Sequence, residues 1–289
     1  MNKDHAAIHD APRQFDMWKL GLIGHGAVAR QALAAMAEHI SAPLEALVVL
    51  VRADSVGKAR DMLGPWQGQV YRELFIVSDV AGLIAQRPTI VAEAAGHQAV
   101  GTFGPAVVRA GIDFLITSAG ALASAPLRET LDASARASGT KWEICSGAVG
   151  GLDILAAARL SGLDDVLYTS RKPPLAWRGT PAETLIDLGS LTQSVTFYEG
   201  SAEAAARDYP QNANVAATIA IMGAGFDRTR VRLVADPAAT RNTHEVSFRS
   251  DCADVDIRIA GKPSPENPKT SLTTGYALAA RLLQMMRAQ

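Results

Sequence analysis

Short apolar runs alternate with longer segments of helical spacing through the first half of the chain. These runs are bounded by glycine or polar residues, which is typical of buried strands. We expect strands at 20–24, 44–51, 74–78, 89–95, 113–119 and 141–147. Residues 27–40 and 98–111 have the apolar spacing of helices instead. Strands that alternate with helices predict an α/β domain of the Rossmann type, with a doubly wound parallel sheet covered on both faces.

The pattern changes after Gly150. A helical segment at 152–163 precedes runs in which apolar and polar residues alternate with a period of two. These runs predict strands at 165–171, 193–201, 228–236, 243–250 and 253–261. An apolar helix is expected at 212–226, and an amphipathic helix at 272–286. The second part is therefore predicted to be α+β, with a mainly antiparallel sheet.

Composition narrows the class of protein. An apolar fraction of 48% is ample for a buried core and excludes wholesale disorder. The 28 basic and 29 acidic residues leave a net charge of −1, so no nucleic-acid partner is predicted. There is no apolar stretch of about 18 residues that would span a membrane. The polar N-terminus lacks the apolar core of a secretory signal, so we expect a cytoplasmic protein.

The two cysteines do not suggest a metal site. Cys145 and Cys252 lie more than a hundred residues apart, and neither belongs to a CxxC pair, which excludes a zinc ribbon. We expect two buried thiols in a reducing compartment, and no bound metal. A cysteine nucleophile is the alternative.

A glycine-rich loop gives the strongest local signal. Gly24-His25-Gly26-Ala27-Val28-Ala29 follows the first expected strand and opens the first expected helix. In this G-x-G-x-x-A pattern, the first glycine permits a tight turn and the second lets the backbone approach a pyrophosphate. Free N–H groups at the helix N-terminus then bind phosphate. We therefore predict that Gly24, Gly26, Ala27 and Val28 bind NAD or NADP.

The end of the second strand bears on the choice of cofactor. An acidic residue often binds the ribose hydroxyls of NAD at this point. This chain has Val51-Arg52 there, with no carboxylate before Asp54. Arg52 either faces the 2′-phosphate of NADP or stacks on the adenine of either cofactor. If the strand ends later, Asp54 takes the ribose-binding role. We expect NADP to be accepted alongside NAD.

Two histidines are candidates for a site between the domains. His244, in RNTHEV, enters a strand of the second domain and is by residue type either structural or catalytic. His97 follows the fourth strand, where it either caps a helix or contacts the cofactor.

Amides and lysines add further candidates. Asn212 and Asn214, in QNANVA, either cap the next helix or face the site. Lys172 in SRKPP and Lys269 in NPKTS lie in proline-flanked loops. Each lysine either binds a substrate carboxylate or is simply solvated.

Taken together, these motifs resemble the L-aspartate dehydrogenase family. The similar segments, in chain order, are GLIGHGAVA, CSGAVGGLD (145–153), SRKPP with the following Trp177, YPQNANVAATIA (209–220), RNTHEV (241–246) and NPKTSLTTGYALA (268–279). The resemblance implies that His244 is the active-site residue and that Ala148 and Asn214 contact NAD. It also implies a homodimer with an antiparallel-sheet catalytic domain. Relatives often carry an aspartate where this chain has Val51-Arg52.

The resemblance implies oxidative deamination of L-aspartate. Hydride leaves Cα for the nicotinamide, and the iminoaspartate formed is hydrolysed to oxaloacetate and ammonia or feeds NAD biosynthesis; the reverse is reductive amination. His244 suits this reaction, because an imidazole with a pKa near neutrality exchanges protons at working pH. Lys172 and Lys269, with Thr270 and Ser271, are expected to bind the substrate carboxylates.

Two other functions remain open. One is an oxidoreductase similar to homoserine dehydrogenase, and the other is a nucleotide-sensing binding protein without turnover. Dihydrodipicolinate reductase is disfavoured, because its HHxxKxDAPSGT pattern is absent.

Four segments follow from this reading. We expect a disordered tail at 1–16, a dinucleotide-binding domain at 17–148 and a catalytic and dimerisation domain at 149–262. The C-terminal segment 263–289 is expected to form a helix that packs back on the dinucleotide-binding domain.

Overall fold

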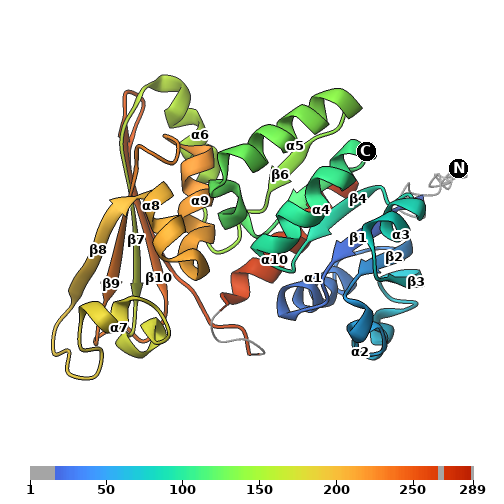
Figure 1. Cartoon of the computed structure of the whole chain (residues 1–289), viewed down its shortest axis with the longest axis horizontal. Coiled ribbons are helices and arrows are strands. Elements are labelled where there is room, and N and C mark those ends of the chain that lie inside the picture. Colours follow the sequence, from blue (N-terminus) through green and yellow to red (C-terminus); the bar gives the residue numbers. More distant parts are fainter. Residues whose placement is uncertain (1–16, 266–269, 288–289) are drawn as a thin grey trace, which may run out of the picture.

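The first half of the chain forms a six-stranded parallel sheet (Figure 1). Its strands are β1 (Lys19–Ile23), β2 (Leu44–Leu50), β3 (Tyr71–Val77), β4 (Ile90–Glu93), β5 (Asp113–Ile116) and β6 (Trp142–Ile144). The computed structural model describes residues 17–265 and 270–287. The strand order β3-β2-β1-β4-β5-β6 is that of the doubly wound dinucleotide-binding fold. The Rossmann-type prediction is therefore confirmed.

Helices cover both faces of this sheet, as the continuous apolar strands require. They are α1 (Ala27–Ala37), α2 (Val56–Leu63), α3 (Val80–Ala85), α4 (His97–Arg109) and α5 (Ala125–Ser138). Successive side chains of β2 serve two cores: Leu47 and Val49 pack with α1 and α2, whereas Val48 and Leu50 pack with α3, α4 and α5. Each strand is therefore buried on both sides.

The second half is built on a five-stranded mixed sheet of order β11-β10-β7-β9-β8. Its strands are β7 (Leu163–Lys172), β8 (Val195–Ser201), β9 (Thr229–Ala235), β10 (Thr243–Ser250) and β11 (Asp254–Ala260). Three of the neighbouring pairs are antiparallel, as expected. The central β7–β9 pair is parallel, because the chain crosses over through β8 and three α-helices before it returns as β9.

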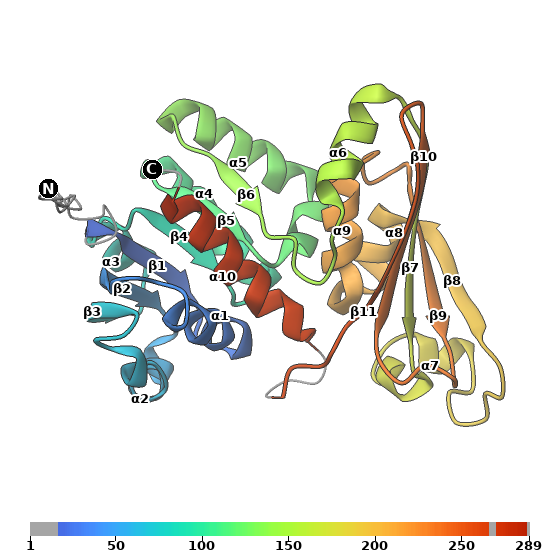
Figure 2. The ribbon, with the colours of Figure 1, turned by 180° about the vertical axis from the view of Figure 1, so that it is seen from behind.

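Helices of the second half lie between its sheet and the first half (Figures 1 and 2). They are α6 (Leu152–Ser161), α8 (Ala202–Asp208) and α9 (Ala213–Met222), while the short α7 (Ala182–Leu185) lies at one end of the sheet. The apolar α9 packs against a 3₁₀ turn at Ala119–Ala123 in the first half. The helices α7 and α8, which are each about two turns or less, were not predicted from the sequence.

The last helix, α10 (Leu272–Arg287), returns to the first half and lies beside α1 (Figure 2). Leu278, Ala279, Leu282 and Met286 enter the core formed by α1 and β1. In the described parts of the chain, no helix combines the length and the apolar character needed to cross a membrane. The tail predicted at 1–16 lies outside the described residues.

Candidate active site

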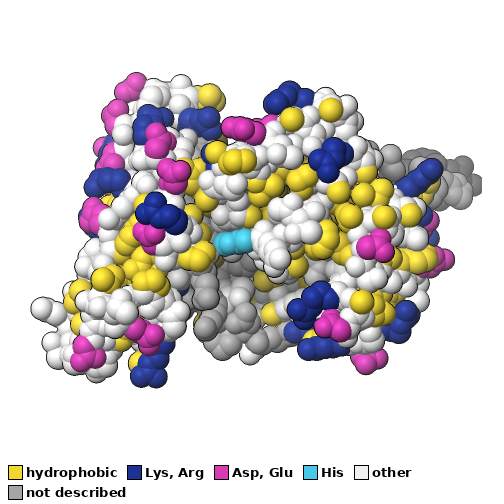
Figure 3. Space-filling model, viewed as in Figure 1, with side chains coloured by type: hydrophobic (Ala, Val, Ile, Leu, Met, Phe, Trp, Pro, Cys, Tyr) yellow, Lys and Arg dark blue, Asp and Glu magenta, His cyan; other side chains and the backbone are white. Residues whose placement is uncertain are grey.

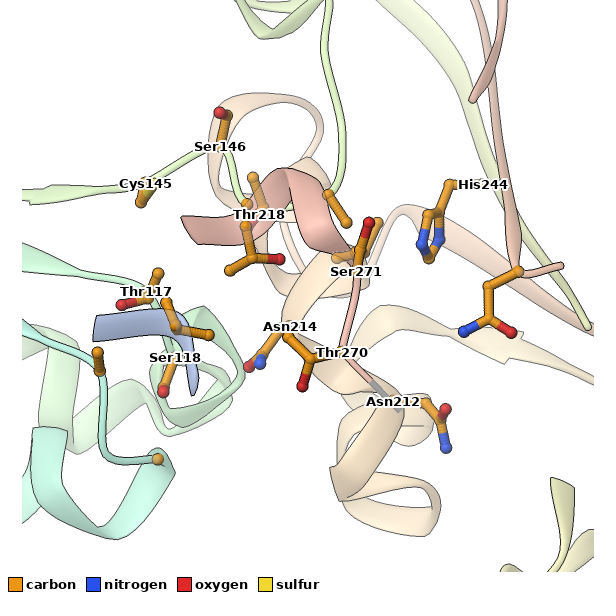
Figure 4. Close-up of a pocket in the computed structure, with 18 of the residues that line it drawn as sticks. Thr117, Ser118, Cys145, Ser146, Asn212, Asn214, Thr218, His244, Thr270 and Ser271 are labelled. Atoms are coloured by element: carbon orange, nitrogen blue, oxygen red, sulfur yellow. The ribbon is translucent and has the colours of Figure 1, made fainter. Parts of the chain in front are cut away.

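A cleft of about 440 Å³ lies where the two halves meet (Figures 3 and 4). One wall is made by loops that follow β1, β4, β5 and β6, at the carboxyl edge of the parallel sheet. The other wall comes from β7, β10 and α9. Ligands of open α/β sheets bind at this carboxyl edge, so the fold itself places the candidate site here.

The glycine loop opens this cleft and fits a pyrophosphate. Gly24 has a φ of +95°, and a Cβ added there would lie 2.9 Å from the Cβ of Ala95, so only glycine is compatible. A Cβ on Gly26 would meet no atom within 4 Å, so the loop faces open space at that point. The first bond within α1 runs from the Arg30 N–H to the Gly26 carbonyl, which leaves the N–H groups of the first turn for an anion.

A second cavity of about 610 Å³ continues on the other side of the glycine loop. The two cavities share Gly26, Ala94 and Ala95, so an elongated ligand can extend from one to the other. Gly24 and Arg52 line only the second cavity. The site therefore has the two-part form that a dinucleotide requires.

Cationic groups surround the second cavity. The side chain of Arg52 is 85% exposed, with Nε 3.6 Å from Oδ1 of Asp54. Strand β2 ends at Leu50, so Asp54 lies beyond the strand, in a 3₁₀ turn. Partial burial lowers the pKa of His25, and the nearby charges of Lys58, Arg30 and Arg52 lower it further. This end of the site is electropositive.

A buried carboxylate orders the loops after β4 and β5. Glu93 is fully buried, and its Oε1 accepts hydrogen bonds from the N–H groups of Ala95 and Gly96 at 2.7 Å each. Oε2 accepts from the Ser118 N–H at 3.0 Å, and Oε1 accepts from the Ser118 hydroxyl at 2.9 Å. One side chain thus fixes two of the loops that line the cleft. Glu93 was not among the residues predicted from the sequence, because it lies within an apolar strand.

Asn214 links the two halves of the molecule. Its Oδ1 lies 2.6 Å from Nε2 of His97, and it accepts a hydrogen bond from the Gly120 N–H at 2.9 Å. Asn214 also lines the cleft, where the family resemblance places a cofactor contact. His97 lines neither cavity, so it contacts Asn214 rather than the space for a cofactor.

Strand β7 presents a polar row to the cleft. Tyr168, Ser170 and Lys172 alternate along the strand and therefore share one face. On the neighbouring strand, His244 pairs in register with Ser170. Figure 4 shows His244 on the side of the cleft opposite Thr117 and Ser118. Neither Tyr168 nor Ser170 was among the residues predicted from the sequence, although the period-two spacing of the YTSRK segment places both on the same strand face as Lys172.

His244 is almost completely buried, with 7% of its surface exposed. Its Nδ1 lies 2.8 Å from the hydroxyl of Tyr168, itself buried. Burial lowers the pKa of His244 to about 4, and the charge of Lys172 adds to the effect. The expected pKa near neutrality is therefore wrong. The imidazole is neutral at working pH, so one ring nitrogen carries a proton and the other can accept one.

Lys172 is the last residue of β7, not the loop residue that the prolines suggested. Its ammonium group donates to Oδ1 of Asn212 and lies 4.5 Å from the ring centroid of Trp177. Asn212 occupies the N-cap position of α9 but makes no capping bond with its side chain, so the capping interpretation is wrong for it. These contacts hold the ammonium group at the wall of the cleft.

Most of the remaining predicted residues also reach this space. Ala27, Val28, Ala148, Thr270 and Ser271 line the main cleft. Lys269 lies outside the described residues.

The cysteines differ in their surroundings. Cys145 is buried at the cleft, and burial raises the pKa of its thiol. Cys252 is exposed on the second domain, so the expectation of two buried thiols is wrong for this one. It lies in the turn between β10 and β11, where side chains are seldom covered.

The fold and the cleft define a two-domain protein of the dinucleotide-binding class. The family described as homoserine dehydrogenase, NAD-binding domain, matches residues 24–144, and the family described as aspartate dehydrogenase, C-terminal, matches residues 153–285. Two L-aspartate dehydrogenases are 39% and 40% identical to this chain over more than 90% of its length, so the chain belongs to the L-aspartate dehydrogenase family.

Similar proteins of known family support this family membership. The chain is 39% identical to an L-aspartate dehydrogenase of Polaromonas sp. over 276 residues, which cover 94% of this chain and 99% of the relative. It is 47% identical to one from Cupriavidus necator over 197 residues, covering 68% and 74%. The solved structure of an aspartate dehydrogenase from Thermotoga maritima has a TM-score of 0.68 at 24% identity, covering 93% of this chain and 96% of that one. This structure shows the shared fold.

Proposed function

We propose that this protein is an NAD(P)-dependent L-aspartate dehydrogenase that converts aspartate into iminoaspartate and then oxaloacetate plus ammonia, and that also runs in reverse. The observation that carries the proposal is the meeting of His244 and Lys172, from two neighbouring strands, at the edge of the glycine-loop cleft. Membership of the family supplies the reaction class. Iminoaspartate that leaves before hydrolysis is available to NAD biosynthesis.

We assign the substrate carboxylates to the Lys172 side of the cleft. Two carboxylates lose most of their hydration there, so they need a cation and several donors. Lys172 supplies the cation, while the hydroxyl groups of Thr270 and Ser271, which line the same cleft, supply donors. We assign Lys269 to the same role by its place in the chain.

The glycine-loop side of the cleft is assigned to the cofactor, through Gly24, Gly26, Ala27, Val28, Ala148 and Asn214, with Arg52 at the distal ribose. A nicotinamide held by these residues would supply the acceptor for the hydride of Cα. The neutral imidazole of His244 takes a proton from the attacking water. Burial is the main cause of the low pKa of His244, and the charge of Lys172 adds to it; a substrate carboxylate beside Lys172 offsets this second, smaller cause.

Two alternatives are less well supported. An enzyme similar to homoserine dehydrogenase is suggested by the first half alone, because the match to that family ends at residue 144. A binding protein without turnover gives no reason to place a buried His244 and Tyr168 pair next to the cofactor space.

Two further assignments complete the proposal. The resemblance supports a homodimer, which light scattering tests as a mass of twice 30.4 kDa. The two unpaired cysteines support a reducing, cytoplasmic location.

Steady-state assays test the function directly. We expect reduction of NAD or NADP with L-aspartate, and oxidation of NADH with oxaloacetate plus ammonia. His244→Asn is expected to reduce kcat by about 10²–10⁴-fold while NADH binding stays intact. Lys172→Met is expected to raise the KM for aspartate far more than the KM for the nucleotide. A wild-type protein that binds NADH but turns over neither substrate pair would favour the binding-protein alternative.

A further inference from the structure

The hydroxyl groups of Tyr168 and Ser170 form a connected path behind His244. The Tyr168 hydroxyl lies 2.8 Å from Nδ1 of His244. Ser170 lies two residues further along β7 on the same strand face, lines the same cleft, and is near enough to Tyr168 to act on its hydroxyl. Both side chains are 1% exposed, so bulk water does not compete for these contacts.

The path begins and ends at the same cleft. His244 and Ser170 are register partners on β10 and β7, and both line the cleft. Directly paired residues on adjacent strands have Cβ atoms about 5 Å apart. Nε2 of His244 and Oγ of Ser170 can therefore serve neighbouring atoms of one small substrate.

An imidazolium is disfavoured at this position. In the described part of the chain, the titratable side chains that line the cleft with His244 are Tyr168, Lys172 and Cys145. Of these, Lys172 carries a positive charge, and neither of the others is ionised at neutral pH, because burial raises the pKa of both. If His244 stays neutral throughout turnover, no second positive charge forms beside Lys172 in this buried position.

We propose that Tyr168 is a positioning residue that holds His244 with its proton on Nδ1, and that Tyr168 and Ser170 relay a proton between His244 and the substrate nitrogen. The proposal rests on the proposed function, because the relay acts on the hydrolysis of the imine.

Atoms and electrons balance in the relay. Water forms a C–O bond to the imine carbon and gives a proton to Nε2, while the C=N electron pair moves to the nitrogen. The Nδ1 proton passes to the Tyr168 oxygen, the Tyr168 proton passes to Ser170, and the Ser170 proton passes to the substrate nitrogen. Every protein group stays neutral. When the adduct breaks down, the relay runs back. The hydroxyl proton of the adduct passes through Ser170 and Tyr168 to Nδ1, and the Nε2 proton passes to the departing amine. Ammonia leaves, and His244 again carries its proton on Nδ1.

Tyr168→Phe and Ser170→Ala test the relay, with Tyr198→Phe as a matched control from β8, outside the cleft. We expect each relay variant to lower kcat for aspartate at least tenfold, while KM for aspartate and Kd for NADH stay within threefold of wild type. The proton inventory of kcat in mixed H₂O and D₂O is expected to curve for wild type and to become linear in both variants. The control is expected to match wild type.

A second measurement does not depend on turnover. NMR of protein with ¹⁵N-labelled histidine reports which ring nitrogen of His244 carries the proton, with His244→Asn to assign the signal. We expect Nδ1–H in wild type and a shift towards Nε2–H in Tyr168→Phe. The relay is overturned if wild-type His244 carries its proton on Nε2, or if either variant keeps kcat within threefold. An inactive wild type with Nδ1–H at His244 would instead reject the proposed function.

Discussion

The chemistry of single residues in this protein depends on burial more than on residue type. His244 shows this most clearly, because its low pKa links the cleft to the stability of the whole fold. The folded-state pKa is about 4, against 6.5 for a free imidazole. Between these values the unfolded chain binds the extra proton and the folded chain does not. The contribution of His244 to the unfolding free energy is therefore fully present above pH 6.5 and is lost as the pH falls towards 4.

His244→Asn is expected to remove this dependence. The difference between the two pKa values corresponds to about 3 kcal/mol. Wild type should lose that much more unfolding free energy than His244→Asn between pH 7 and pH 4. Urea denaturation of both proteins at several pH values measures the difference. Parallel curves would show that His244 is not buried as a neutral group.

Arg52 offers a second prediction at the residue scale. It faces an electropositive cavity, and its partner Asp54 lies at 3.6 Å on an exposed surface, where an ion pair contributes little. A contact with the 2′-phosphate of NADP contributes about 1.5–3 kcal/mol, less where solvent screens it. Arg52→Ala should therefore lower kcat/KM for NADP about tenfold and leave the value for NAD nearly unchanged.

Two variants sharpen this measurement. Arg60→Ala removes a nearby cation that does not line the cavity, and we expect it to leave both kcat/KM values unchanged. Asp54→Asn frees Arg52 from its ion pair and should move the preference towards NADP. A wild type that rejects NADP would show that a different residue excludes the phosphate.

At the scale of the elements, strands were more predictable than short helices. The buried strands of the first half form continuous apolar runs because both faces are covered, and such runs are visible without a structure. The helix α8 has only seven residues, mostly alanine, and its Ser201 cap is its clearest signal. The parallel pairing of β7 with β9 could not be predicted. Period-two alternation shows which side chains of a strand share a face, but it does not show which strand pairs with it.

The residues of the candidate site also differ in how far the sequence predicted them. Local motifs predicted the glycine loop, and family resemblance predicted His244 and Asn214. Glu93 and Tyr168 were missed because their roles arise from pairing between distant segments. Glu93 acquires its partner Ser118 only when β4 and β5 lie side by side, and Tyr168 acquires His244 only through β10.

The packing of α10 on α1 depends on one glycine. A Cβ on Gly275 would lie 2.6 Å from Cβ of Gln31, at the contact between these two helices. Gly275→Ala should therefore lower the unfolding free energy by about 1–3 kcal/mol, although alanine is the better helix former.

Gly57 provides the matched control. It lies in α2, is exposed, and a Cβ there would meet nothing within 4 Å. Gly57→Ala should stabilise the protein by about 0.5–1 kcal/mol. Chemical denaturation of both variants measures the contrast. A stabilised Gly275→Ala would mean that the two helices separate at little cost.

At the scale of the whole molecule, the site exists only while the two halves keep their relative position. The glycine loop belongs to one half, and His244 and Lys172 belong to the other. Asn214 joins them, because its side-chain oxygen contacts His97 and Gly120 across the junction. The structure leaves little room here: a Cβ on Gly120 would lie 2.5 Å from the His97 ring.

His97→Ala should therefore weaken nucleotide binding although His97 lines neither cavity. Without the ring, the side-chain oxygen of Asn214 loses one of its two partners among the described residues and keeps the Gly120 N–H. Losing one hydrogen bond of about 1 kcal/mol predicts roughly a fivefold rise in the Kd of NADH. Fluorescence titration measures the Kd, with Arg109→Ala at the far end of α4 as the control. Calorimetry adds a second readout, because a weaker junction should broaden the unfolding transition or divide it in two. Unchanged affinity together with a single sharp transition would show that the α9 contacts with the 119–123 turn hold the halves together without His97.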